Sequence, residues 1–254
     1  MNAAETGLAH LRAGLDSALE ASLAPLRGTD EPLGVLFSGG VDSSLLAWEL
    51  RTRRGLSLCT VGQEKSPDVL AGRRAAESLG LPWNGMIVGP AEVHDAEERF
   101  APDLEGALPV VRSVLVSLAL AFELASPARL VCGQGVDELF LGYSHYQTLD
   151  EDGAARRSDS DLRRLRDDDW PRTVRIARRA GKEVVAPFLA EAFESAARRV
   201  PIALRLPGNA PKQFFREWAM ARGLPAALAL RPKKAIQYGS GIDALRRRRG
   251  SGPT

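Results

Sequence analysis

The sequence predicts an α/β protein in which a parallel sheet is flanked by helices and followed by a C-terminal helical extension. Four short runs rich in apolar residues are expected to be strands, at 33–37, 56–61, 83–88 and 129–132. Segments with helical spacing of apolar residues separate these runs. Such alternation of strand and helix favours parallel strands joined by right-handed crossovers.

Helices are expected before the first strand and after the second. Apolar residues recur at helical spacing over residues 7–24, so 1–30 is predicted to be an N-terminal helix packed on the core. Ser66 followed by Pro67 indicates the start of a further helix, because serine caps a helix and proline suits its first position. Gly80 indicates where that helix stops.

The chain changes character after residue 148. A helix over 108–125 leads into the fourth strand and completes an α/β domain over 31–148. A helical extension that completes the active site is expected over 149–245, and a disordered tail over 246–254. Residues 149–169 are dense in Asp and Arg, which predicts a solvated loop and helix face. No strand alternation is recognisable after this point.

Composition limits the partners and the compartment. The 254 residues carry 34 Lys and Arg against 32 Asp and Glu, so no overall basic field indicates nucleic acid. Cys59 and Cys132 lie in apolar runs and are predicted to be buried thiols in a reducing compartment. The N-terminus is unlike a signal peptide, and the apolar run 114–124 is too short to span a bilayer. We therefore expect a soluble, cytoplasmic protein without membrane contact.

A glycine-rich turn follows the first predicted strand and opens a helix over 41–51. Residues 36–44 read Leu-Phe-Ser-Gly-Gly-Val-Asp-Ser-Ser. Glycines let the backbone approach an anion, hydroxyls donate to it, and the helix start adds partial positive charge. The residues expected to contact phosphate are Ser38, Gly39, Gly40, Ser43 and Ser44. The carboxylate of Asp42 is compatible with a phosphate-binding turn if a divalent cation lies between it and a pyrophosphate group.

This turn resembles the PP-loop of ATP pyrophosphatases, whose SGGxDS signature is complete in residues 38–43. It is not a Walker A loop, because it lacks the Gly-Lys-Ser/Thr sequence. The resemblance implies that ATP is bound and cut between its α- and β-phosphates. It also implies an adenine nucleotide alpha hydrolase-like fold, with ATP and Mg²⁺ as the expected cofactors.

A second turn, residues 133–143, follows the fourth predicted strand and reads Gly-Gln-Gly-Val-Asp-Glu-Leu-Phe-Leu-Gly-Tyr. It resembles the GxGxDExFxGY motif in the synthetase domain of asparagine synthetases. The resemblance implies that Asp137 joins Asp42 in holding Mg²⁺. Two carboxylates at the carboxyl ends of parallel strands can converge on one hard cation. By the same resemblance, adenine lies against Leu36, Val61 and Gly133.

A third match lies late in the chain. Residues 231–241 resemble the RxKxxxxxGxG segment of the same family, which implies that Lys233 reaches the α-phosphate and the acyl-adenylate transition state. A positioned ammonium would stabilise charge as it develops there. Two weaker similarities are the family's Lys-x-x-x-Arg helix at 212–216 and its PFLD turn at 186–189, where Ala190 stands in place of Asp.

Two departures from the family concern nitrogen transfer. Full-length asparagine synthetases begin with a glutaminase domain whose cysteine follows the initiator methionine, whereas Asn2 stands here. The sequence therefore predicts a synthetase domain alone, supplied with free ammonia, another amine or a separate glutaminase chain. The family's glycine-flanked glutamate is Gln134, whose carboxamide can orient a substrate but cannot accept a proton.

The leading interpretation is an AMP-forming carbon–nitrogen ligase that adenylates a carboxylate, with aspartate as one candidate, and transfers the acyl group to ammonia or an amine. Lys233, Asp42 and Asp137 are its expected catalytic residues. A tRNA-modifying PP-loop enzyme is one alternative, to which the arginines at 246–249 would offer phosphate contacts. An ATP-binding regulatory protein without ligase activity is the other, and Gln134 supports it.

Overall fold

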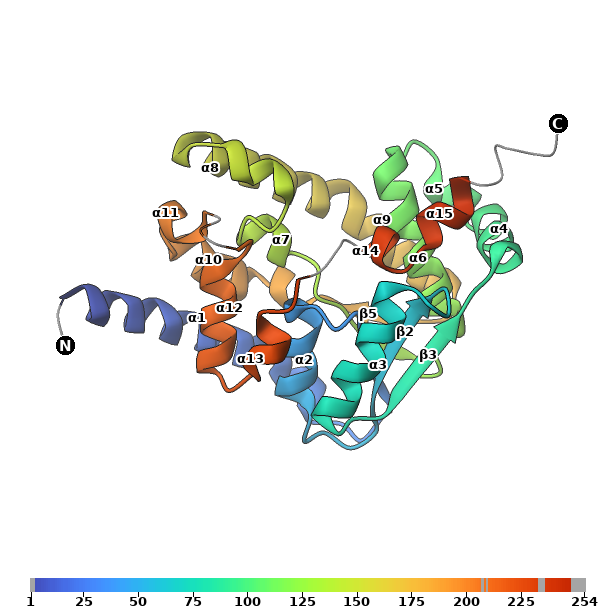
Figure 1. The fold of residues 1–254 in the computed structure, drawn as a ribbon, viewed down its shortest axis with the longest axis horizontal. Coiled ribbons are helices and arrows are strands. Elements are labelled where there is room, and N and C mark those ends of the chain that lie inside the picture. The colour runs from blue at the N-terminus through green and yellow to red at the C-terminus, as the bar shows by residue number, and fades with distance from the viewer. Residues whose placement is uncertain (1–2, 207, 209, 233–235, 248–254) are drawn as a thin grey trace.

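The computed structural model describes residues 3–206, 208, 210–232 and 236–247. At its centre is a parallel sheet of five strands in the order β3-β2-β1-β4-β5 (Figure 1). The strands are β1 Leu33–Leu36, β2 Leu56–Gly62, β3 Trp83–Ile87, β4 Arg129–Val131 and β5 Glu183–Val185. The predicted fold class and the four predicted strands are confirmed.

The strand order reverses at β1. From β1 the chain adds β2 and β3 on one side and then returns to add β4 and β5 on the other. Gly34 of β1 therefore pairs with Ser57 of β2 and with Leu130 of β4. A side chain at position 34 would collide with Leu130. In open parallel sheets, ligands bind beyond the carboxyl ends of the strands at such a reversal.

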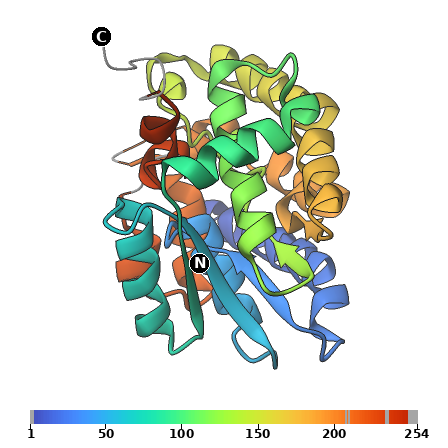
Figure 2. The same ribbon diagram turned by 90° about the vertical axis from the view of Figure 1, so that its right-hand side faces the viewer.

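Helices cover both faces of the sheet (Figures 1 and 2). Helix α2, Val41–Leu50, packs on β1, and α3, Pro67–Leu79, packs on β2 and β3 from the same side. Helices α6, Pro109–Leu124, and α9, Trp170–Arg179, pack on each other and cover the opposite face.

Eleven further α-helices and three 3-10 or π-helical segments are found in the described residues. The longer ones are α1 Ala3–Arg27, α4 Pro90–Arg99, α8 Glu151–Arg164, α10 Glu191–Arg199, α12 Gln213–Ala221 and α15 Ile242–Arg247. The four-residue helices are α5 Ala101–Leu104, α7 Val136–Leu139, α11 Ile202–Arg205, α13 Ala226–Ala229 and α14 Ile236–Gly239. Two 3-10 segments are Ser144–Thr148 and Pro187–Leu189, and a π-helical segment is Leu165–Asp169. Within the described ranges, no helix combines the length and apolar character needed to cross a membrane.

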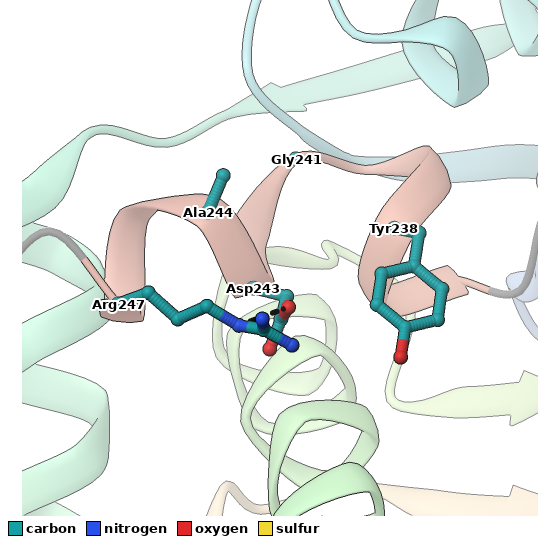
Figure 3. A pocket seen from close by; sticks show the side chains of 5 residues that line it. All are labelled: Tyr238, Gly241, Asp243, Ala244 and Arg247. Atoms are coloured by element: carbon teal, nitrogen blue, oxygen red, sulfur yellow. Dashed lines mark ion pairs between the residues drawn. The ribbon is translucent and has the colours of Figure 1, made fainter.

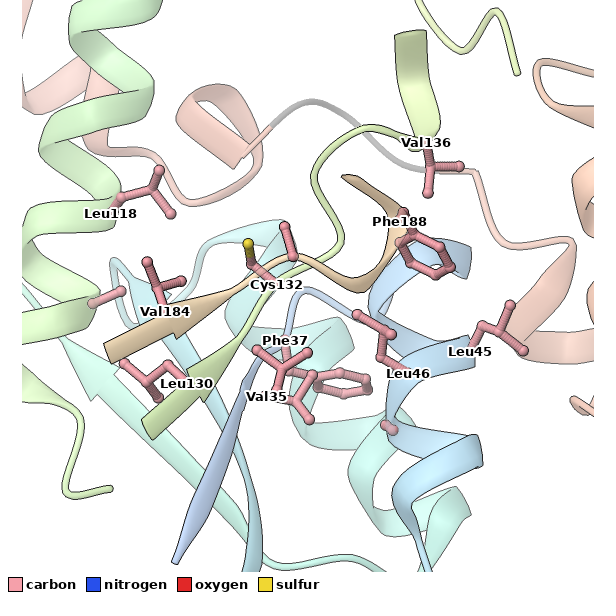
Figure 4. Packing of buried hydrophobic residues seen from close by; sticks show 14 of the residues in the cluster. Val35, Phe37, Leu45, Leu46, Leu118, Leu130, Cys132, Val136, Val184 and Phe188 are labelled. Carbon is pink, nitrogen blue, oxygen red and sulfur yellow. The ribbon is translucent and has the colours of Figure 1, made fainter. Parts of the chain in front are cut away.

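The core lies between the sheet and these helices. Figure 4 shows Leu45 and Leu46 of α2 on one side of the strands and Leu118 of α6 on the other. Val35 of β1 and Leu130 of β4 are fully buried between them. Burial on both faces explains why these strands are apolar throughout and show little alternation.

Helix α1 packs on the core through one of its faces. The fully buried residues of α1 are Leu15, Leu19 and Leu23. Arg222, at the end of α12, donates to Asp16 and Glu20 of α1 and to Glu49 of α2 at 2.6–2.8 Å. One guanidinium thus joins three helices.

The boundaries predicted for α3 are also confirmed. The hydroxyl of Ser66 accepts a hydrogen bond from the backbone N–H of Val69, which is the expected cap. Gly80 ends the helix with a φ of 64°, in the left-handed region that favours glycine.

Two expectations for the C-terminal part were wrong. The segment 149–245 is not wholly helical, because β5 adds a strand to the sheet edge beside β4. The tail predicted from residue 246 begins too early, since α15 extends through Arg247 and Arg246 donates to Glu97 of α4 at 2.8 Å. Residues 248–254 lie outside the described residues. The division of the chain at residue 149 stays a prediction.

Residues 151–169 are helical, and only their outer face is solvated. Helix α8 continues into the π-helical segment, and Asp161, Leu162 and Leu165 on the inner face are buried. Asp161 accepts hydrogen bonds from the Tyr146 hydroxyl and His145 Nε2, both at 2.9 Å. This carboxylate therefore fastens α8 to the chain that follows the second turn.

Candidate active site

The turns that follow β1 and β4 are in contact at the carboxyl edge of the sheet. A Cβ added to Gly133, the second residue after β4, would lie 2.9 Å from the Cβ of Asp42 in α2. That distance is shorter than ordinary packing allows, so any side chain at position 133 would force the turns apart. The two predicted motifs therefore form one site.

The first turn has the backbone expected of an anion loop. Gly39 has a φ of 66°, and an added Cβ would lie 3.1 Å from the carbonyl oxygen of Ala71. Ser43 Oγ is 3.3 Å from Ser38 N and 3.2 Å from Gly40 O, at the long end for hydrogen bonds. Phosphate oxygens can replace such weak contacts.

Ser44 differs from the other two serines of the turn. Its side chain is fully buried, and its hydroxyl has no hydrogen-bond partner among the described residues. Buried hydroxyls are seldom left in this state, because the lost water contacts are costly. The predicted contact of Ser44 with phosphate stays a prediction, and it requires the turn to open around an anion.

Three charged side chains converge between the two turns. The ammonium of Lys212 lies 2.8 and 2.7 Å from the two carboxylate oxygens of Asp42. The same nitrogen lies 2.9 Å from Oδ1 of Asp137. Because both carboxylates contact one cationic atom, Asp42 and Asp137 lie close enough to share a cation, as the motifs suggested. That this cation is Mg²⁺ stays a prediction.

From the sequence, Lys212 was assigned no role at this site. Burial lowers the pKa of its ammonium, but the charges of Asp137 and Asp42 outweigh that effect and hold the pKa above its ordinary value. Its backbone has a φ of 58°, which is unusual for a residue with a side chain. The available signal was the Lys-x-x-x-Arg pattern that it shares with Arg216.

The second turn is built tightly around Asp137. Glu138 is buried, and burial together with the neighbouring Asp137 charge raises its pKa to about 7. The Tyr143 hydroxyl donates to Glu138 at 2.6 Å. Gly142 passes so close to Asp137 that any side chain there would collide with the carboxylate. Glu138 thus serves the local packing of this turn.

Gln134 lies between β4 and the start of α7. Its carboxamide oxygen is 4.0 Å from the sulfur of Cys132, which is a weak contact. Burial raises the pKa of the Cys132 thiol to about 12, so this group is a neutral thiol. The predicted substrate-orienting role of Gln134 stays a prediction.

The third motif is anchored at both ends. Arg231 donates to the carbonyl oxygen of Ser38 at 3.0 Å, and the carbonyl of Ser240 accepts from the N–H of Gln63 at 2.9 Å. The motif thus contacts the first turn at one end and the residue after β2 at the other. Lys233, its expected catalytic residue, lies outside the described residues.

The expected adenine contacts lie at three neighbouring strand ends. Leu36 ends β1 and is half-buried, and Gly133 follows β4. Val61 lies near the end of β2 with only 4% of its surface exposed, so its side chain belongs to the core. Contact between Val61 and adenine would therefore use the backbone, and these roles stay predictions.

The residues present fit a phosphate-bound Mg²⁺ better than a metal held by protein alone. The described residues contain no group of three or more His, Cys, Asp or Glu side chains able to hold an ion. Mg²⁺ prefers one or two carboxylates with phosphate and water completing its shell. Asp42 and Asp137 provide such a pair beside an anion loop.

Two cavities lie away from this pair of turns. One of about 270 Å³ is lined by Tyr238, Gly241, Asp243, Ala244 and Arg247, where α14 meets α15 (Figure 3). Asp243 there is already paired with Arg247 and with the Ser113 hydroxyl. The other, about 530 Å³, includes Trp83, Pro32 and Pro127 at the amino ends of the strands. Neither cavity is lined by residues of the two turns.

The chain matches a known family over most of its length. The family model described as asparagine synthase matches residues 14–158 and 146–250. This chain belongs to the asparagine synthase family. The family consists of ATP-dependent amidating ligases with a PP-loop, in agreement with the three motifs and with the parallel sheet.

Curated relatives include proteins named asparagine synthetase [glutamine-hydrolyzing]. The relative from Gallus gallus is 31% identical over 82% of this chain and 39% of its own length. That from Cricetulus griseus is 30% identical over 92% of this chain and 44% of its own length. That from Homo sapiens is 30% identical over 83% of this chain and 40% of its own length. The chain spans less than half the length of these relatives.

A solved structure described as a predicted subunit of a tRNA methyltransferase from Methanocaldococcus jannaschii also resembles this chain. The similarity covers 80% of this chain and 94% of that one, with a TM-score of 0.36 and 16% sequence identity. A likeness of this degree has no bearing on function.

Proposed function

We propose that this chain uses ATP to convert a carboxylate into an acyl-adenylate and then transfers the acyl group to ammonia or another amine. The observation that carries the proposal is the convergence of Asp42 and Asp137 on one cationic atom beside the glycine-rich turn. Family membership supports the same chemistry.

The proposed first step is attack by a carboxylate oxygen on the α-phosphorus of ATP. The bond to the bridging oxygen breaks, and pyrophosphate leaves with the electron pair. Asp42 and Asp137 would hold Mg²⁺, which would neutralise charge on the pyrophosphate. The backbone N–H groups and hydroxyls of the first turn would bind its phosphate oxygens. Lys233 is proposed to contact the α-phosphate.

The second step forms the C–N bond and releases AMP. The amine nitrogen attacks the acyl carbon and must lose a proton, which Gln134 cannot accept. A more basic amine, a second substrate group or solvent would have to take that proton. Aspartate remains one candidate for the carboxylate, and a separate glutaminase chain one candidate for the source of ammonia.

The experiment that tests this proposal is ATP–pyrophosphate exchange with each amino acid in turn, because exchange reports adenylation whatever the amine. We expect exchange with at least one carboxylate and its loss in Asp42→Asn. Asp152→Asn removes an exposed aspartate of α8 and serves as the matched control. ATP binding without exchange for any acid would favour a nucleotide-binding regulatory protein instead.

A further inference from the structure

Lys212 occupies the position that the two motif carboxylates would offer a metal. Its ammonium contacts both oxygens of Asp42 and one oxygen of Asp137 within 2.9 Å. Burying carboxylates without a counter-charge is costly, and Asp42 is largely shielded from solvent. Lys212 supplies a positive charge to both carboxylates.

We propose that Lys212 is a tethered cation that keeps free divalent metal out of the site until a nucleotide arrives. The inference rests on the proposed function, because it assumes that Asp42 and Asp137 hold the metal of a metal–nucleotide complex. An ammonium and a divalent ion repel each other and cannot share one position between these carboxylates. Metal binding therefore requires that Lys212 leave.

A bound triphosphate would offer the Lys212 ammonium an alternative anionic partner. Phosphate oxygens bound at the first turn carry enough negative charge to accept a lysine ammonium in place of a carboxylate. Lysine suits this exchange because its charge sits on a flexible four-carbon stem. Bound nucleotide should therefore raise the affinity of the protein for the metal, and bound metal should raise its affinity for the nucleotide by the same factor.

The surroundings allow the side chain of Lys212 to move while its helix stays in place. One turn further along, Arg216 donates to the carbonyl oxygens of Pro211 at 2.8 Å and Arg231 at 3.3 Å, which fixes the start of α12. A Cβ on Gly142 would lie 2.9 Å from Cδ of Lys212. Glycine at position 142 therefore leaves the space that the lysine stem needs.

The test is a titration with Mn²⁺ followed by electron paramagnetic resonance, with and without α,β-methylene ATP as the nucleotide probe. In wild-type protein we expect the analogue to tighten Mn²⁺ binding by about tenfold or more. Lys212→Met should bind Mn²⁺ about tenfold more tightly than wild type when no nucleotide is present, with correspondingly weaker coupling. Lys65→Met, on an exposed loop, should behave as wild type. Adding Asp42→Asn to Lys212→Met should abolish the gain and so locate the new site.

The outcomes separate this inference from the proposed function. If nucleotide-free wild-type protein binds Mn²⁺ as tightly as with the analogue, Lys212 excludes nothing and the inference is overturned. If no Mn²⁺ binds even with the analogue, the metal role of Asp42 and Asp137 fails, and the proposed function fails with it. The wild-type titration decides both points even where Lys212→Met does not fold, and Lys212→Gln provides a second variant.

Discussion

Lys212 and Asp42 are 170 residues apart in the chain, yet the ammonium of one lies 2.7 Å from the carboxylate of the other. Asp42 belongs to the first turn of α2, and Lys212 directly precedes α12. The C-terminal part of the chain thus supplies a side chain to the site formed by the strand ends. That the extension completes an active site stays a prediction, which this contact supports.

Asp137→Asn tests the metal role with little disturbance of the fold. The side chain of Asp137 is 38% exposed, so removing its charge should lower the unfolding free energy by only about 1 kcal/mol. ATP–pyrophosphate exchange should nevertheless fall about a hundredfold or more, because charge on the pyrophosphate loses its partner. Asp167→Asn removes an exposed aspartate and is the control for both measurements. Exchange near the wild-type rate in Asp137→Asn would exclude the proposed metal pair.

Local sequence revealed the two turns but not the residue between them. The glycine-rich turns follow apolar strands, so residue type and order suffice to place Asp42 and Asp137 at one sheet edge. The contact with Lys212 depends on how distant segments pack, which no local pattern contains. For the same reason the last two residues of α15 were wrongly assigned to a disordered tail, because Arg246 forms its ion pair with Glu97, 149 residues away in the chain.

Strand β5 was missed for a different reason. It has three residues, Glu183–Val185, of which the first is exposed. A run this short shows neither alternation nor an extended apolar stretch, and its pairing with β4 stabilises it. By contrast, the longer apolar runs of β1 and β2 were recognisable because nearly all of their residues are buried.

Gly133→Ala should separate the two turns. The added Cβ would lie 2.9 Å from Cβ of Asp42 and 3.5 Å from the backbone N of Ser43, so one turn must shift. We expect stability to fall by about 1–3 kcal/mol and ATP affinity by about tenfold, measured by urea unfolding and calorimetry. In Gly14→Ala, within α1, the new methyl group meets no atom within 4 Å, and stability should rise by up to about 1 kcal/mol. Unchanged ATP affinity in Gly133→Ala would show that the contact between the turns does not shape the nucleotide site.

Asp161 should make the protein sensitive to acid. Burial raises the pKa of its carboxyl group, but hydrogen bonds from Arg157, Tyr146 and His145 outweigh burial and hold the pKa below its ordinary value of 3.8. A carboxyl group with a lowered pKa stabilises the fold when ionised, above its unfolded pKa. This stabilisation is therefore present near neutral pH and is lost as the pH falls below about 4.

Asp161→Asn should remove that pH-dependent contribution. Near neutral pH, the free energy of unfolding should fall by about 1–3 kcal/mol, because Tyr146 and His145 lose a charged acceptor. The difference from wild type should narrow as the pH falls below about 4, where the wild-type carboxylate is protonated. Urea unfolding at several pH values measures both effects, with Asp152→Asn as the exposed control. Equal stability of Asp161→Asn and wild type near neutral pH would mean that the carboxylate does not fasten α8.

Gln134→Glu addresses the second half of the proposed reaction. Gln134 follows Gly133 at the second turn, and its amide cannot take the proton that an attacking amine must lose. A glutamate there supplies a carboxylate general base, a change of a kind that contributes about 10²- to 10⁴-fold in favourable cases. We expect ATP–pyrophosphate exchange to persist and the yield of amide from free ammonia to rise, measured by mass spectrometry of the product. Gln147→Glu adds the same charge at an exposed position and should leave both readouts as in wild type. Gln134→Glu could instead give no more amide than wild type while ATP–pyrophosphate exchange continues. In that case another group accepts the proton of the attacking amine, and residue 134 does not limit amide formation.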